Sequence, residues 1–285
     1  MSNQPETRPY GAWRSPFSSA FVARAEVRLA RTAIEGDRIF WSERRPSEGG
    51  RSAVVRCNAD GTVCDSLPPP FDARSRVHEY GGGAFLPHDN ALFFSNDADR
   101  RLYRCADDRP PEPLTPESPL RYADAVFDER RDRLICIAED HGVSGSEPAN
   151  FIAAAPADGG EAVPLVSGRD FYATPRVRPD GNAIAWLCWD HPNMPWEAAE
   201  VWLADLDAEG RIHRPRHIAG GDGEPVFQPE WSPDGVLHFV SDRSGYWNLY
   251  RIETNGVRQL TDEAAEFGLP QWIFGMSTYG FLNND

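Results

Sequence analysis

The stretch DHGVSGS (residues 140–146) places the three residue types of a serine hydrolase side by side. In such an enzyme a serine attacks a carbonyl, a histidine takes its proton and an aspartate orients the histidine. The serine normally stands in the pattern G-x-S-x-G on a sharp turn from strand to helix, and here Ser146 occupies the place of the second glycine. We therefore interpret 140–146 as a polar connecting loop and predict no catalytic residue in this chain.

Three more places contain histidines, either two together or one beside an aspartate, and none of them has the spacing of a metal site. His213 and His217 are separated by Pro215, which excludes a helix that would present both on one face. The pairs at 88–89 and 190–191 are predicted to lie in loops, each without a second cluster nearby in the sequence. We predict no metal and no cofactor.

The chain contains no lysine, so all its basic side chains apart from histidine are arginines. This excludes pyridoxal-phosphate enzymes and Walker-type nucleotide hydrolases, which both need a lysine. The glycine-rich pieces 81–83 and 220–223 lack the strand-then-helix context of a phosphate loop. We expect the glycines of 81–83 to let two backbones pack closely at the crowded inner end of a sheet.

Two stretches have residue types suited to binding. In VHEYGGG (77–83), Glu79 can hold the cationic amino terminus of a peptide, and His78 and Tyr80 can form hydrogen bonds to it. We expect this stretch to begin the first strand of a sheet and to face a central channel. The alternative is a packing motif between neighbouring sheets.

The second stretch is DHPNMPW (190–196), an insertion between two predicted strands. Its prolines are rigid, and we expect Met194 and Trp196 to be exposed beside His191 and Asn193. Such a surface suits contact with another domain or with a ligand. The alternative is a loop packed against itself.

The elements that position these residues come from an internal repeat. PRVRPDG (175–181) matches PEWSPDG (229–235), and in both an apolar strand residue is followed by a Pro-Asp-Gly turn and another apolar run. Proline presets φ, aspartate bonds to its own backbone and glycine adopts the positive φ of the turn. The unit comprises four short strands and returns roughly every 40–54 residues, a period typical of β-propeller blades.

We therefore predict an all-β fold, a β-propeller of four-stranded blades with about five blades and the start of a sixth. The predicted parts are a lead-in segment 1–32, blades at 33–67, 78–115, 122–166, 172–219 and 225–262, and a partial blade at 268–285. An unfinished blade lacks the partners that would cover its strands. Either the chain is a piece of a longer protein, or the ring is open and associates with another chain.

Composition excludes several partners. The net charge of −15 and the pI near 4.9 leave no basic surface for nucleic acid. No apolar run approaches the roughly 20 residues needed to cross a bilayer, so we expect no membrane association. The N-terminal residues have no apolar signal region, and the five cysteines are scattered. We expect free thiols and a cytoplasmic location, with a hairpin disulfide between Cys57 and Cys64 as the alternative.

Several motifs in this order resemble one family. YGAWRSP, RVHEYGGGAF, DFYATPRVRPDGNAIAWLCWDHPNMPWEAAEVWLADL, FQPEWSPDGVLHFVSDRSGYWNLYRI and EFGLPQWIFGMSTYGF are similar to the N-terminal propeller of prolyl oligopeptidase-family serine peptidases, in the dipeptidyl aminopeptidase/acylaminoacyl peptidase-like branch. The resemblance implies a propeller that screens access of short peptides or acyl-peptides to a C-terminal α/β-hydrolase domain. That domain carries the Ser, Asp and His, so we expect this chain alone not to hydrolyse peptides.

Two other functions remain open from the sequence. WSPDG-type blades also occur in TolB-like propellers, which favours a standalone protein-binding module as the alternative. The third interpretation is an open ring whose incomplete blade pairs between chains.

Overall fold

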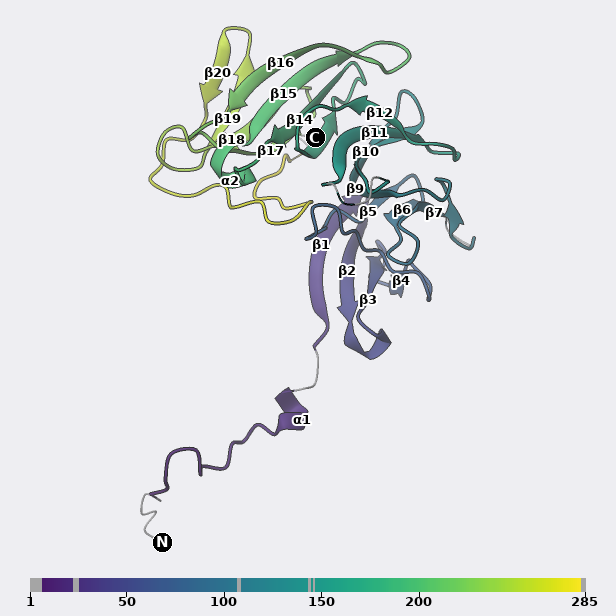
Figure 1. Cartoon of the computed structure of the whole chain (residues 1–285), viewed down its shortest axis with the longest axis vertical. Coiled ribbons are helices and arrows are strands. Elements are labelled where there is room, and N and C mark those ends of the chain that lie inside the picture. Colours follow the sequence, from purple (N-terminus) through teal and green to yellow (C-terminus); the bar gives the residue numbers. More distant parts are fainter. Residues whose placement is uncertain (1–6, 23–25, 107–108, 143–144, 146, 283–285) are drawn as a thin grey trace.

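The computed structural model describes residues 7–22, 26–106, 109–142, 145 and 147–282 (Figure 1). The described part of the chain contains five separate four-stranded antiparallel sheets, and in each sheet the strands pair in sequence order. Residues 7–22, which include the short helix α1 (Ser19–Val22), extend away from the sheets (Figure 1). The prediction of an all-β chain of four-stranded blades is confirmed.

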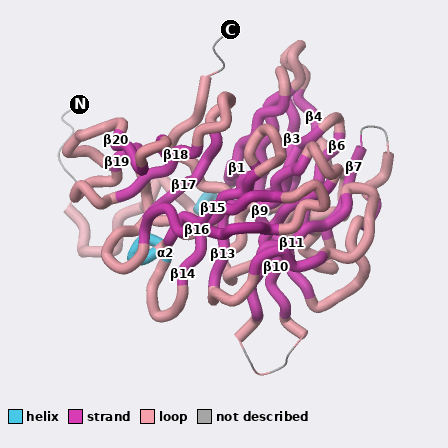
Figure 2. Tube along the Cα trace, turned by 90° about the horizontal axis from the view of Figure 1, so that it is seen from above, coloured by secondary structure: helices cyan, strands magenta, loops and turns pink. Residues whose placement is uncertain are grey.

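The five sheets follow the chain as blades one to five. Their strands are β1 (Arg28–Glu35), β2 (Arg38–Arg45), β3 (Arg51–Cys57) and β4 (Val63–Asp65); β5 (Phe85–His88), β6 (Ala91–Ser95), β7 (Leu102–Ala106) and β8 (Glu112–Pro113); β9 (Leu120–Asp128), β10 (Arg133–Asp140), β11 (Ala149–Pro156) and β12 (Val163–Val166); β13 (Phe171–Val177), β14 (Ala183–Trp189), β15 (Glu200–Leu206) and β16 (Ile212–Gly220); and β17 (Val226–Trp231), β18 (Leu237–Ser241), β19 (Asn248–Glu253) and β20 (Gly256–Gln259). Two short helical turns, η1 (Pro46–Glu48) and α2 (Pro195–Ala198), interrupt blades one and four. Almost all regular structure is therefore strand (Figure 2).

The Pro-Asp-Gly turns form as predicted. Gly181 donates its N–H to Arg178 O at 2.8 Å, and Gly235 donates to Ser232 O at 2.8 Å. Both glycines have positive φ, 70° and 78°. Each turn joins the first and second strands of its blade, so the repeated sequence specifies the same hairpin twice.

The first strands of the blades lie next to one another around a common axis. β5 contacts β1 and β9, and β13 contacts β9 and β17. Apolar side chains fill the space between blade faces, and every residue of β14 is buried. Burial of both faces of the middle blades is the main stabilising term of this arrangement.

Hydrogen bonds join the blades near the axis. Asp124, Thr174 and Gln228 occupy equivalent bulges in β9, β13 and β17, with φ of 52°, 51° and 49°. Thr174 N donates to Asp124 Oδ2 at 2.9 Å, and Asp124 N donates to Gly83 O at 2.8 Å. The bulges thus turn polar groups of one blade toward the next.

The ring of sheets is not closed, and its ends differ from the prediction. β1 begins at Arg28, within the segment predicted as lead-in, because its pairing with β2 extends to Arg44. Residues 268–282, predicted to start a sixth blade, contain no strand; they form one bridge, between Phe274 and Gly82. A single segment forms no strand here, because no neighbouring strand is available to pair with it along its length. It runs from the loop before β5 to β17, where Gln228 bonds to Tyr279.

The five cysteines are free. Cys57 pairs with Val63, and Cys64 pairs with Arg56, so the two thiols lie on opposite faces of blade one and the alternative disulfide is wrong. No helix in the described part of the chain is long and apolar enough to cross a membrane.

Candidate functional site

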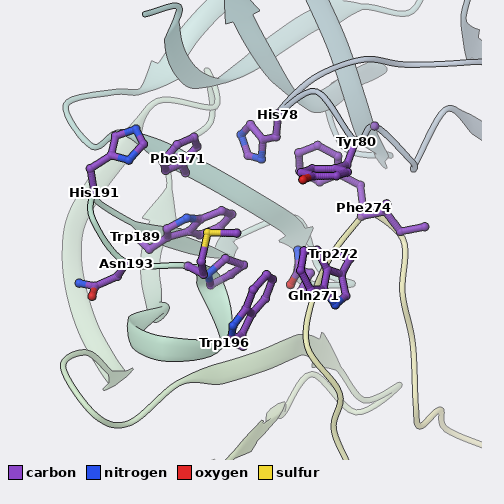
Figure 3. Close-up of a pocket in the computed structure, with 14 residues that line it drawn as sticks. His78, Tyr80, Phe171, Trp189, His191, Asn193, Trp196, Gln271, Trp272 and Phe274 are labelled. Atoms are coloured by element: carbon purple, nitrogen blue, oxygen red, sulfur yellow. The ribbon is translucent and has the colours of Figure 1, made fainter.

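An aromatic pocket lies where three distant segments meet at one end of the propeller (Figure 3). It has a volume of about 180 Å³. The segments are the loop 77–83 before β5, the paired ends of β13 and β14 with the loop that follows β14, and residues 271–274. The lining residues are His78, Tyr80, Gly81, Phe171, Trp189, His191, Asn193, Met194, Pro195, Trp196, Gln271, Trp272, Ile273 and Phe274. None of them carries a carboxylate or a guanidinium group.

Rings from the three segments contact each other around the pocket (Figure 3). His78 lies 4.8 Å from Phe274 and 5.6 Å from Trp189 between ring centroids. On the other side, Trp196 and Trp272 are 4.3 Å apart. These contacts fix the loops relative to one another and leave aromatic faces and edges toward the cavity.

The loop 77–83 holds His78 in a strained backbone conformation. His78 and Glu79 have φ of 54° and 63°, a region that L-residues rarely adopt. The His78 N–H donates to Oε1 of the buried Glu139 at 3.0 Å, which anchors the turn. The stretch was predicted to start a strand facing the channel; it is a turn, and β5 begins only at Phe85. Strain maintained by surrounding contacts is frequent at binding sites.

Burial lowers the pKa of His78 to about 4, and the nearby Asn150 side chain offsets only part of this effect. The Nε2 atom of His78 is buried and forms no hydrogen bond. His78 is therefore neutral at pH 7 and contributes an uncharged ring to the pocket.

Arg169 and Asp170, which directly precede β13 of blade four, fix the start of the loop 190–196. Arg169 Nε donates to Asp190 Oδ2 at 2.6 Å, and its two terminal nitrogens each lie 3.0 Å from a Glu200 oxygen. The bonds to Glu200 raise the pKa of Arg169. Asp170 N donates to Asp190 Oδ1, and His191 N donates to Asp170 Oδ2. Three hydrogen bonds thus hold the start of the loop.

An acidic groove of about 910 Å³ adjoins the aromatic pocket. The two share the residues His78, Tyr80, Phe171 and His191. The groove is also lined by the carboxylates of Glu79, Glu139, Glu147 and Asp170, together with His141 and Arg169. It can hold a cationic group next to whatever occupies the aromatic pocket.

The groove contains the histidine of the hydrolase-like stretch. His141 Nε2 is 2.6 Å from Glu139 Oε2, and Asp140 bonds instead to the backbone of Gly142. Ser144 and Ser146 lie outside the described residues. Within the described part, the groups of three or more His, Cys, Asp and Glu side chains that could bind a metal are absent.

The two stretches singled out from the sequence belong to one site. His78 and Tyr80 line the same pocket as His191, Asn193, Met194 and Trp196, although the sequence suggested two separate roles. Glu79 lines the groove, with 83% of its side chain exposed. Trp196 is half-buried against Trp272 rather than exposed.

Sequence reasoning missed several residues of the site, all from strand ends or from the C-terminal segment. They are Phe171, Trp189, Gln271, Trp272, Phe274, Glu139, His141, Arg169 and Asp170. Their position within the repeat could have indicated that these residues belong to the site. Phe171 and Trp189, for example, pair with each other at the ends of β13 and β14. Strand ends at one side of a propeller converge, so their side chains are candidates for a shared site.

Five four-stranded blades around an axis define a β-propeller, and similar propellers occur in solved structures of peptidases. The puromycin-hydrolyzing peptidase of Mycobacterium tuberculosis is 38% identical, with a TM-score of 0.86 over 95% of this chain and 44% of its own. A puromycin hydrolase matches with 38% identity and a TM-score of 0.87, over 95% of this chain and 45% of its own. A mutant of puromycin hydrolase was solved in complex with PGG. No family model and no curated protein matches the sequence.

The chain belongs, as a propeller region, to the prolyl oligopeptidase family of peptidases, as its motifs predicted. It spans less than half the length of these relatives. An oligogalacturonate lyase (18% identity, TM-score 0.58) and TolB of Acinetobacter baumannii (16%, 0.54) share the fold alone.

Proposed function

We propose that this chain is the substrate-selecting propeller of a peptidase that acts on short peptides or acyl-peptides, with the catalytic Ser, Asp and His on a C-terminal α/β-hydrolase domain. The observation that carries the proposal is the convergence of residues 77–83, 190–196 and 271–274 on one aromatic pocket beside an acidic groove. The similarity to peptidases that hydrolyse puromycin supports it. We also propose that the chain forms one propeller unit after a lead-in segment, with β1, which begins at Arg28, as its first strand.

In this proposal the groove receives the amino terminus of the substrate. Glu79 is exposed, and its Oε1 lies 3.8 Å from Arg121, which also lies 3.8 Å from the buried Glu139. An ammonium group can approach Glu79 from the groove without being desolvated completely. His78, Tyr80 and His191 line both the groove and the pocket, whereas Asn193, Met194 and Trp196 line the pocket alone.

Binding to the 285-residue chain tests the proposal directly. Short peptides with an aromatic residue should change the fluorescence of the tryptophans that line the pocket. The same chain should release no product from peptide nitroanilides and should not react with a serine-directed fluorophosphonate. Labelling of a serine, or the absence of any peptide binding, would contradict the proposal.

A second candidate is a TolB-like module that binds a protein partner, or an open ring that associates with itself. One face of blade one favours it. Ile34, Ile39, Cys57 and Val63 form a cross-strand row, and the exposed fractions of the three aliphatic residues are 75%, 47% and 57%. Exposed apolar rows of this kind mark contact surfaces. A concentration-dependent molecular mass with no peptide binding would favour this candidate.

We also propose a cytoplasmic location. The five free thiols support it, since disulfides are rare in the cytosol and frequent in secreted proteins. Fractionation of cells that produce the protein tests this proposal.

A further inference from the structure

The aromatic pocket and the acidic groove differ in chemistry, and this difference indicates which part of a substrate each one takes. We propose that the aromatic pocket binds a neutral aromatic ring that carries a hydrogen-bond donor, and that Gln271 Oε1 accepts that donor. This inference rests on the proposed function and adds the substrate class and a residue that sets specificity.

The size of the pocket suits a single ring. Its volume is about 180 Å³, and a dry apolar cavity of about 150 Å³ is known to bind benzene. The walls include the rings of Phe171, Trp189, Trp196 and Trp272. The His78 ring also lines the pocket. Aromatic groups prefer offset or edge-to-face neighbours, and walls that meet at an angle offer both.

The charges favour a neutral occupant. Aromatic cages also bind quaternary ammonium ions, since the ring faces are negative. Here the carboxylates, including Glu79 and Glu139, line the adjacent groove and not the pocket. A cationic group is therefore attracted to the groove, and the ring attached to it enters the pocket. The neutral state of His78 at pH 7 is consistent with an uncharged ligand.

Gln271 provides the polar contact. It lies beside Trp272 at the edge of the pocket (Figure 3), and its Oε1 is buried without a hydrogen-bond partner. A buried acceptor without a partner is unfavourable, so a ligand that donates a hydrogen bond there gains affinity over one that does not. A phenol O–H or an indole N–H fits this role, and an unsubstituted phenyl ring does not.

The experiment compares three blocked amino acids on the complete chain: the N-acetyl amides of tyrosine, phenylalanine and cyclohexylalanine, titrated by calorimetry. These probes have no free amine, so their binding does not depend on Glu79. We expect tyrosine to bind about fivefold more tightly than phenylalanine, and phenylalanine to bind more tightly than cyclohexylalanine. In Gln271→Met, the tyrosine affinity should fall to that of phenylalanine, whose own affinity should stay unchanged.

The matched control is Gln259→Met, at the exposed end of β20, whose amide bonds to Thr261 O. It should leave the order of the three ligands as it is in the unmodified chain. Equal binding of phenylalanine and cyclohexylalanine would overturn the assignment of an aromatic ligand. Equal binding of tyrosine and phenylalanine to the unmodified chain would overturn the role of Gln271, even if Gln271→Met fails to fold.

Two further results separate this inference from the proposed function. If none of the amides binds while short peptides with free amino termini do, the aromatic pocket is not a ligand site, and the peptidase role of the groove stands. If the amides bind in the expected order and peptides do not, the pocket assignment stands and the proposed peptide selection fails.

Discussion

Gly82 and Phe274 form a parallel bridge between the loop before β5 and the C-terminal segment, 192 positions apart in the sequence. Phe274 N donates to Gly81 O at 2.9 Å. Gly82 has φ of +92°, and a Cβ atom there would lie 2.4 Å from Phe274 O. The bridge joins the loop that carries His78 to the segment that carries Trp272, so the pocket depends on this close approach of two backbones.

We therefore expect Gly82→Ala to separate the two segments and open the pocket. The free energy of unfolding should fall by about 2–3 kcal/mol, from the positive φ and the contact together. Gly61→Ala is the matched control, because Gly61 also has positive φ (+82°) but no atom within 4 Å of the added Cβ. Gly61→Ala should lower the free energy of unfolding by only about 1 kcal/mol and leave ligand binding unchanged. Equal losses in the two variants, by urea unfolding, would show that the bridge is not tightly packed.

The pKa of His78 predicts a pH dependence of stability. The pKa is lowered from 6.5 to about 4 in the folded chain. Below pH 6.5 the unfolded chain binds a proton that the folded chain does not, so the stability from neutral His78 is complete above pH 6.5 and is lost as the pH falls toward 4. Between pH 7 and pH 5 the loss is about 2 kcal/mol.

Comparison with His78→Gln isolates this contribution, since all other titrating groups, including His238 with its lowered pKa, are common to both proteins. The unfolding free energy of the unmodified chain should decrease more steeply from pH 7 to pH 5 than that of His78→Gln. Parallel curves would mean that His78 titrates normally and is not buried.

Arg169 is predicted to position the loop 190–196. It bonds to both Asp190 and Glu200, and Asp190 in turn accepts a bond from the backbone of Asp170. Arg169→Met should lower the unfolding free energy by about 1 kcal/mol, since the pairs are partly exposed. It should also weaken binding of N-acetyl-tyrosinamide severalfold, because the loop supplies one wall of the pocket.

The control is Arg178→Met, which breaks a similar two-point pair with Asp180 in a turn of blade four. It should lower stability by a comparable or smaller amount and leave ligand binding unchanged. Identical binding by both variants, measured by calorimetry, would show that the loop holds its position without Arg169.

The blades could be predicted from the sequence because their signal is local. The repeat of apolar strand, Pro-Asp-Gly turn and apolar strand fixes the hairpins, and Gly181 and Gly235 form the turns it predicts. The arrangement of the site is not local. The pattern around Gln271 and Trp272 predicts the start of a further blade, whereas the bridge at Phe274 and the ring contacts of this segment place both residues in the pocket with His78.

Because sequence patterns report local structure only, one site was interpreted as two. Periodicity assigns residues 77–83 and 190–196 to different blades, and in the structure the first stretch precedes β5 and the second lies between β14 and β15. It cannot show that the ends of those blades face the same cavity, since this depends on how blades two and four turn about the axis. A pattern of residue types likewise does not predict the positive φ values of His78 and Glu79.

Glu79 is expected to bind the amino terminus of a peptide. Glu79→Gln keeps the shape of the side chain and removes its charge, so affinity for tripeptides with a free amino terminus should fall about fivefold, less at high salt. Affinity for the same peptides after N-acetylation should not change. Glu129→Gln is the control, since Glu129 is also exposed but lines a different cavity, beside His88. Equal effects on free and acetylated peptides, measured by calorimetry, would remove the role of Glu79.

The exposed row on blade one predicts association. Ile39 stands in the middle of the row, paired with Ile34 on one side and Cys57 on the other. If this face binds a second copy, Ile39→Glu should shift the chain to a monomer in sedimentation velocity runs, because a carboxylate in an apolar contact is unfavourable. Val163→Glu, at an exposed position of β12, should leave the mass distribution unchanged. A monomeric unmodified chain at every concentration would show that the row does not mediate self-association, and equal shifts in both variants would assign the effect to net charge.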